Sequence, residues 1–220
     1  MSRDEAGPRN VSKPSASASA RFLALGDSYT IGEGVPACDR WPFQLAAALR
    51  SAGLAVDDPA IIATTGWTTD ELRVAIDASA CTPPFALVSL LIGVNNQYRG
   101  RDLDNYRGEF AGLLATAVSM AGAEPARVVV VSIPDWGVTP FAADKGADVV
   151  RVADEIDRFN AINRELAEGA GAHWVDVTAI SRGAGRDLLV ADGLHPSAAQ
   201  YAMWTARILP VARQILAGDS

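Results

Sequence analysis

Short apolar runs and amphipathic segments alternate along the chain from residue 21 to its end. A continuous apolar run predicts a buried strand, because a parallel strand that is covered on both faces has no polar side to expose. The runs that we expect to form strands are residues 21–25, 56–64, 85–92, 127–133 and 173–177.

Between these runs, apolar residues recur at the three- and four-residue spacing of a helix, as Phe110, Leu113, Leu114 and Ala117 do. Thr68, followed three residues later by Glu71, resembles a capping box. The expected helices are residues 41–50, a segment that opens at Thr68, and residues 104–122, 148–169 and 197–217. The alternation predicts an α/β fold: a single three-layer α/β/α domain over residues 21–220, with a five-stranded parallel sheet.

Residues 1–20 are rich in Ser, Ala and Pro and contain no apolar stretch. This composition predicts a disordered N-terminal tail and not a secretory signal. No run approaches the roughly 20 apolar residues of a membrane helix, so we expect no membrane span.

The longest irregular stretch, residues 134–146, follows the fourth expected strand. Ligands bind outside the carboxyl ends of the strands in open parallel sheets. Trp136 and Phe141 in this stretch are therefore candidates for a pocket wall, with the alternative that they only anchor a surface loop.

Composition narrows the class of partner. The formal net charge of −7 disfavours nucleic acid, which demands a basic face. Cys38 and Cys81 have no metal-type spacing, and two reduced thiols in a cytoplasmic protein are favoured over a disulfide. No cluster of His, Cys and Asp has metal-ligand spacing either, so we expect no metal and no cofactor.

Polar side chains that carry chemistry follow the first three expected strands. Ser28 follows the first, Gly66 the second and Asn95 the third. The carboxyl ends of parallel strands meet at one edge of a sheet, so we expect these residues to converge there. Asp192 and His195 precede the last helix, with Pro196 expected at its first position.

These residue types match nucleophilic catalysis. A serine needs an adjacent base, which His195 supplies, and Asp192 would hold the imidazole in the useful tautomer. The oxyanion of an attacked ester needs fixed donors. The backbone N–H groups of Ser28 and Gly66 and the amide of Asn95 are the candidates, with glycine at 66 allowing close approach of the main chain.

In order and spacing, Gly26-Asp27-Ser28, Gly66, Gly93-Val94-Asn95 and Asp192-Gly193-Leu194-His195 resemble the motifs of the SGNH hydrolases, the GDSL-type esterases and lipases. The resemblance implies a flavodoxin-like fold and a serine esterase that hydrolyses esters of small or medium acyl groups through an acyl-enzyme. One departure is Asn96, where the family usually has Asp. Any salt bridge or charged hydrogen bond through which that Asp would support the loop is therefore in doubt.

Two alternatives remain open at this stage: a non-catalytic binding module on the same fold, and acyl transfer to a sugar or alcohol. The expected partner is a small-molecule ester, and the sequence predicts no oligomeric state. We expect Asp27 to brace the serine turn, and His173 to be structural. The candidates for lining the pocket beside the catalytic residues are Trp67, Tyr98, Trp136 and Leu194.

Overall fold

Five parallel strands form the central sheet of the computed structural model, which describes residues 19–218. Their order in the sheet is β2-β1-β3-β4-β5, the order of flavodoxin-like folds. The prediction of a five-stranded parallel sheet is confirmed. The strands are β1 (Phe22–Gly26), β2 (Ala60–Ala63), β3 (Leu87–Leu91), β4 (Val128–Val131) and β5 (His173–Val175).

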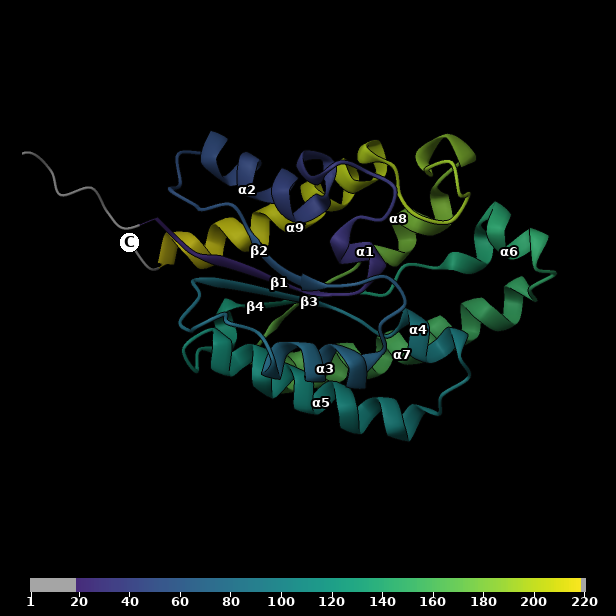
Figure 1. Ribbon diagram of the computed structural model, residues 1–220, viewed down its shortest axis with the longest axis horizontal. Helices are drawn as coiled ribbons and strands as arrows, with labels where there is room; N and C mark the ends of the chain where they lie inside the picture. Colours follow the sequence, from purple (N-terminus) through teal and green to yellow (C-terminus); the bar gives the residue numbers. More distant parts are fainter. Residues whose placement is uncertain (1–18, 219–220) are drawn as a thin grey trace, which may run out of the picture.

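Helices cover both faces of the sheet, which gives the three predicted layers (Figure 1). One face carries α2 (Trp41–Ser51) and α9 (Ala198–Gly218). The other face carries α3 (Thr69–Asp77), α5 (Leu103–Met120) and α7 (Val149–Ala170). Shorter helices follow the strands: α1 (Ser28–Ile31), α4 (Val94–Tyr98), α6 (Pro140–Asp144) and α8 (Thr178–Gly183), with 3-10 turns η1 (Ala37–Asp39), η2 (Pro125–Arg127), η3 (Trp136–Val138) and η4 (Arg186–Leu188).

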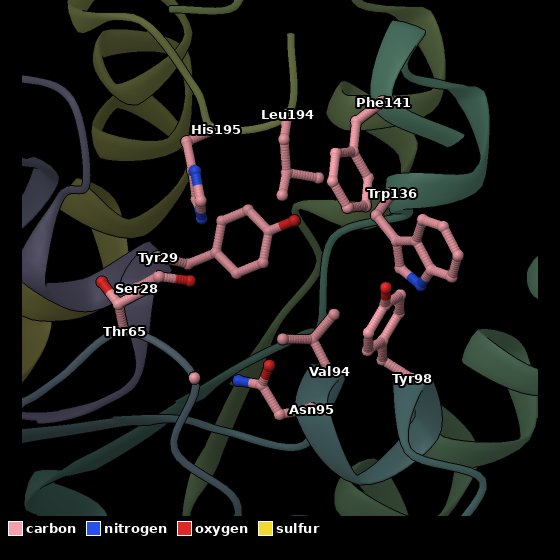
Figure 2. A pocket seen from close by; sticks show the side chains of 11 residues that line it. Ser28, Tyr29, Thr65, Val94, Asn95, Tyr98, Trp136, Phe141, Leu194 and His195 are labelled. Atoms are coloured by element: carbon pink, nitrogen blue, oxygen red, sulfur yellow. The ribbon is translucent and has the colours of Figure 1, made fainter. Parts of the chain in front are cut away.

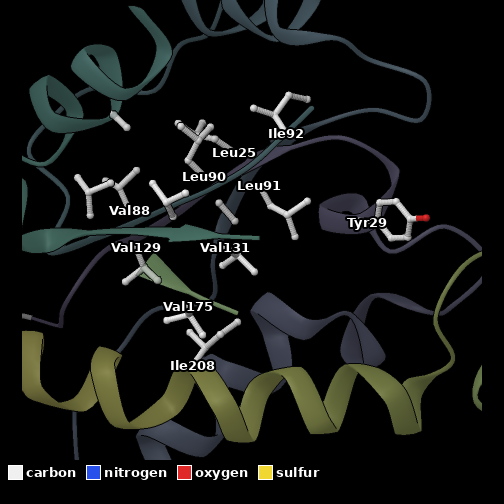
Figure 3. Packing of buried hydrophobic residues seen from close by; sticks show 14 of the residues in the cluster. Leu25, Tyr29, Val88, Leu90, Leu91, Ile92, Val129, Val131, Val175 and Ile208 are labelled. Carbon is white, nitrogen blue, oxygen red and sulfur yellow. The ribbon is translucent and has the colours of Figure 1, made fainter. Parts of the chain in front are cut away.

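Every residue of β1, β3 and β4 is buried, because these central strands have neighbours on both edges and helices on both faces. Figure 3 shows how one helix closes the core: Ile208 of α9 points at Val131 of β4 and Val175 of β5. All three side chains are at most 5% exposed. Burial of these apolar side chains fixes the position of the sheet between the helical layers.

Helix starts test the sequence predictions directly. Thr68 is the N-cap of α3, and the Glu71 carboxylate accepts its backbone N–H at 2.8 Å, which confirms the capping box. The prediction that Pro196 begins the last helix is wrong, because α9 begins at Ala198. Pro196 instead forms an isolated bridge with Leu189, and this pairing keeps the backbone extended up to the helix.

Several expected segments differ in detail. The run at residues 56–64 holds a shorter strand, and Val56 forms only an isolated bridge with Ala20. Residues 134–146 are less irregular than expected, since they contain η3 and α6. Cys38 and Cys81 are free thiols. Across residues 19–218, no helix is long and apolar enough to span a membrane. The tail expected over residues 1–20 lies, except for its last two residues, outside the described part of the chain.

Candidate active site

Three loops at the carboxyl ends of neighbouring strands meet at one cavity of about 150 Å³. Ser28 begins α1 directly after β1, Gly66 lies in the turn after β2, and Asn95 lies in α4 after β3. His195, from the segment before α9, joins them in the lining (Figure 2). The structure thus brings together four of the five predicted site residues, and the fifth, Asp192, contacts His195.

Asp27 braces the turn that presents Ser28. One of its carboxylate oxygens accepts the Tyr29 N–H at 3.0 Å, so Asp27 braces the turn as predicted, and it does so as the N-cap of the short helix α1. The side chain is fully buried, and burial raises its pKa to about 7 even though the hydrogen bond from Tyr29 favours the charged form. The Ser28 N–H is the first of the helix and has no acceptor within it.

His195 and Asp192 form a hydrogen-bonded pair. The Nδ1 atom of His195 lies 2.7 Å from Asp192 Oδ2, so Nε2 is the ring nitrogen left to face the cavity. Asp192 Oδ1 also accepts the backbone N–H groups of Leu194 and His195, at 2.8 and 3.0 Å. Burial raises the pKa of Asp192, but these hydrogen bonds outweigh burial and hold the pKa below its usual value.

Ser28 and His195 both line the cavity, and their side chains face each other (Figure 2). Figure 2 shows the imidazole pointing toward Ser28. Within residues 19–218 no hydrogen bond joins the two side chains, and such bonds commonly tighten only when substrate is bound. The Tyr29 ring packs against the His195 imidazole, with ring centroids 5.4 Å apart. This contact restricts the orientation of the imidazole.

Gly66 is required for its backbone conformation. Its φ is +89°, in the left-handed region that favours glycine. The sequence interpretation stressed room for close approach, but a Cβ here would meet only Arg99 Nη2, at 3.9 Å. Among the described residues, no group accepts the Gly66 N–H, which leaves it as a donor for a ligand.

Asn95 has one amide hydrogen fixed and one to spare. Its Nδ2 donates to the Trp67 carbonyl oxygen at 2.8 Å. A carbonyl oxygen only accepts, so this bond decides which end of the amide is the NH2 group. An NH2 group has two hydrogens, and the second is available to the cavity that Asn95 lines.

Side-chain contacts tie the three loops together. Arg99, at the end of α4, donates from Nη2 to the Gly66 carbonyl oxygen at 2.6 Å. The same guanidinium lies 3.4 Å from Glu71 of α3. On the other side, the Thr65 hydroxyl donates to the Glu33 carboxylate, which joins the turn after β2 to the loop after α1. The spacing of the three candidate oxyanion donors is therefore fixed by these links.

The Asn96 position does not need a carboxylate. Asn96 is fully buried; its Oδ1 accepts the Thr69 N–H at 3.1 Å, and its Nδ2 donates to the Thr69 hydroxyl at 2.6 Å. That hydroxyl donates in turn to Glu109. Because the Thr69 hydrogen is committed to Glu109, its oxygen needs a donor, and an amide provides one where an ionised Asp would not.

The pocket walls are mostly apolar. Tyr98, Trp136 and Leu194 line the cavity as predicted, and so does Phe141, the second aromatic residue predicted as a pocket wall. The prediction for Trp67 is wrong: its carbonyl faces Asn95, while its side chain lies over a surface hollow beside α3. The sequence analysis missed three lining residues, whose only signal was adjacency to Ser28, Gly66 and Asn95: Tyr29, Thr65 and Val94.

Two polar residues outside the cavity have structural contacts. His173 lies in β5 and does not line the pocket, in agreement with the sequence interpretation. Asp176 accepts from the Thr178 N–H at 2.8 Å and from the Ser132 hydroxyl at 3.1 Å, which caps the turn before α8. Across residues 19–218, no three His, Cys, Asp or Glu side chains are grouped as metal ligands.

Residues 24–203, which include every predicted site residue, match the family model described as the GDSL-like lipase/acylhydrolase family. The chain belongs to this family. Members of the GDSL-like lipase/acylhydrolase family hydrolyse ester bonds, and the chain is accordingly an ester-bond hydrolase of the SGNH type. No curated protein matches the sequence.

Solved structures agree with the GDSL-like fold. TesA superposes with a TM-score of 0.70 at 19% identity, over 89% of this chain and 99% of that one. A lipase/acylhydrolase from Enterococcus faecalis gives 0.67 at 18% identity, over 90% and 96%. A variant of Axe2, an acetyl xylan esterase from Geobacillus stearothermophilus, gives 0.67 at 17% identity, over 88% and 94%. At these identities the likeness establishes the fold alone.

Proposed function

We propose that the protein is a serine esterase that hydrolyses carboxylic esters through an acyl-enzyme, with Ser28 as the nucleophile. The observation that carries the proposal is the shared cavity, in which Ser28 and the His195–Asp192 pair lie beside the N–H groups of Ser28 and Gly66 and the Asn95 amide. Ser28 is activated by a base, because a serine hydroxyl at its ordinary pKa is a poor nucleophile.

In the first step, the Ser28 oxygen attacks the ester carbonyl carbon and its proton passes to His195 Nε2. The Asp192 carboxylate keeps Nδ1 protonated and stabilises the imidazolium. The oxyanion accepts from the Ser28 N–H, the Gly66 N–H and the second Asn95 amide hydrogen. The bond to the leaving alcohol then breaks, and the alcohol departs with the proton from His195.

In the second step, water attacks the acyl-enzyme while His195 takes one of its protons. The oxyanion forms again on the same three donors. The bond to the Ser28 oxygen breaks, the proton returns from His195 to Ser28, and the carboxylic acid leaves.

The lining supports an uncharged, apolar acyl group of small to medium length. Among residues 19–218, His195 is the only one with a basic side chain around the cavity, and no carboxylate of this range lines it. Of its other polar side chains, Thr65 is engaged by Glu33 and Asn95 partly by Trp67, which leaves mainly the hydroxyls of Tyr29 and Tyr98 on the walls. A sugar ring would need several polar partners on these walls, whereas an alkyl chain needs only the apolar surface that is present.

The assignment is tested with Ser28→Ala on a 4-nitrophenyl butanoate substrate. We expect kcat to fall by roughly a thousandfold or more, because the nucleophile is lost. Asn95→Ala, which removes one oxyanion donor, is expected to lower kcat by about a hundredfold. Near-normal turnover by the Ser28 variant would reject the nucleophile.

Two further measurements separate the alternatives. A fluorophosphonate probe should label Ser28 in the wild-type protein and leave Ser28→Ala unlabelled, whereas a non-catalytic binding module would not be labelled at all. Turnover in the presence of added alcohol or sugar should still release mainly the free acid; a product that is mainly the new ester would instead identify an acyltransferase.

A further inference from the structure

The positions of the catalytic groups leave one direction for the acyl chain, if the proposed function holds. The carbonyl oxygen must face Gly66 and Asn95, and the leaving oxygen must face His195, which returns a proton to it. The third substituent of the carbonyl carbon therefore points away from both. Figure 2 shows Tyr98, Trp136 and Phe141 on the side of the cavity opposite His195 and Ser28.

These three aromatic residues form one packed group from two loops. The Trp136 ring lies 5.2 Å from the Tyr98 ring and 6.2 Å from the Phe141 ring, both edge-on. Tyr98 is half exposed at the rim, whereas Trp136 is only 7% exposed. Trp136 is therefore the member that closes the far end of the cavity.

A relay of hydrogen bonds fixes the Trp136 indole. Its Nε1 donates to Gln97 Oε1 at 2.7 Å, and Gln97 Nε2 donates to Glu155 of α7, also at 2.7 Å. Gln97 is 5% exposed, so water does not readily replace it as the acceptor of the indole N–H. A buried N–H without an acceptor costs free energy, and this penalty ties the ring to one orientation.

The backbone beside Trp136 is fixed as well. Asp135 is 1% exposed, accepts the Gly137 N–H at 2.8 Å and pairs with Arg182 Nε at 2.8 Å. Hydrogen bonds thus fix Trp136 both at its backbone and at its ring nitrogen. We therefore expect the indole to resist displacement by a longer acyl chain.

We propose that Trp136 is the end wall that limits the length of the acyl group, and that Gln97 is the positioning residue that sets this limit by holding the indole N–H. This inference rests on the proposed esterase function and extends it to substrate selection. Neither residue touches the reacting atoms, so both act on which ester is accepted.

The test compares kcat/KM for 4-nitrophenyl butanoate and decanoate. Trp136→Ala should raise the decanoate-to-butanoate ratio by about tenfold or more, because the end of the cavity opens. Trp136→Phe should raise it less, since a smaller ring remains. The matched control is Trp174→Phe, which also removes an indole N–H held at 2.7 Å by an amide oxygen, that of Asn163, but lies outside the cavity. Its ratio should equal that of the wild type.

Gln97 is tested by a double-mutant cycle. Gln97→Leu removes the acceptor, releases the indole and should raise the ratio about threefold or more, whereas a merely structural defect would lower kcat/KM for both esters equally. In Gln97→Leu/Trp136→Phe the N–H that needs Gln97 is gone, so the ratio should match that of Trp136→Phe alone.

The outcomes are distinguishable from failure of the proposed function. If the wild type hydrolyses neither ester and the fluorophosphonate probe does not label Ser28, the esterase proposal fails. If the wild type is active but Trp136→Ala leaves the ratio within about twofold of the wild type or lowers it, the end-wall inference is overturned. If Gln97→Leu and Trp136→Phe have additive effects on the ratio, Gln97 does not position the indole.

Discussion

The Asp27 side chain is fully buried, and its carboxylate accepts one hydrogen bond. One oxygen accepts the Tyr29 N–H, and within the described residues the other oxygen has no hydrogen-bond partner. Burial therefore raises its pKa from 3.8 to about 7. The residue that braces the serine turn is thus mostly protonated in mildly acidic solution, and its ionisation opposes folding.

The sign of the pH effect follows from the two states. Between about pH 4 and 7 the unfolded chain loses the Asp27 proton while the folded protein keeps it, so the free energy of unfolding falls as pH rises. A shift of this size corresponds to about 4 kcal/mol by pH 7. Asp27→Asn cannot ionise and should lose less stability between pH 5 and 8 in urea unfolding. Asp104→Asn, at an exposed carboxylate, is the control; equal pH slopes for wild type and Asp27→Asn would contradict the prediction.

Single residues were predictable where chemistry constrains spacing. Ser28, Gly66 and Asn95, predicted from the strands that they follow, line one cavity with His195. Asp192 and His195 are in contact, as a three-residue spacing allows. Trp67 was not predictable, because the direction of a side chain in a turn depends on dihedral angles such as the φ of Gly66. The hydrogen bonds around Asn96 were equally hidden, since its partner Thr69, and Glu109, which accepts from Thr69, come from other helices.

At the scale of elements, long segments were predictable and short ones were not. The buried strands and α2, α3, α5, α7 and α9 were found because their hydrophobic patterns extend over enough residues to show a period. Helices α1, α4, α6 and α8 were missed, since four to six residues span too little of a turn pattern. Three of these short helices, α1, α4 and α6, line the cavity, so the sequence located the candidate site better than the local backbone that forms it.

Contacts between elements lead us to expect that Arg99 positions the proposed oxyanion site. Arg99→Ala removes the bond to the Gly66 carbonyl and the ion pair with Glu71, which frees the turn that carries the Gly66 N–H. We expect kcat for 4-nitrophenyl butanoate to fall by roughly tenfold or more, because small misplacements of fixed groups are costly.

The control for Arg99 is Arg107→Ala, which removes a comparable surface arginine paired with Glu165 at 2.8 Å on α5 and α7. Its kcat should stay within about twofold of the wild type. A kcat for Arg99→Ala that equals that of the control would show that Asn95 and Glu33 alone hold the turn.

At the scale of the whole molecule, side chains that stabilise the fold lie apart from the cavity. Ile208 is 1% exposed on α9 and packs on the sheet away from the cavity (Figure 3). Ile208→Ala should lower the free energy of unfolding by about 2–5 kcal/mol in a urea titration, with kcat unchanged at a temperature where the variant is folded. Met203→Ala, at an exposed position of the same helix, should change stability little. A large loss of kcat in folded Ile208→Ala would contradict this separation.

The strand order β2-β1-β3-β4-β5 has a consequence for how such a protein diversifies. The three proposed oxyanion donors follow strands β1, β2 and β3, which are neighbours in the sheet. The proposed end wall, Trp136, lies in the segment after β4. The backbone of residues 134–146 is tied to the loop that carries Asp192 and His195, because the Phe141 N–H donates to the Gly193 carbonyl oxygen at 3.1 Å. The side chains with which this segment lines the cavity can change without breaking that bond. New ester preferences therefore become accessible through side-chain substitutions in one connection, whereas a change in its length would also disturb the loop of the proposed Asp192–His195 pair.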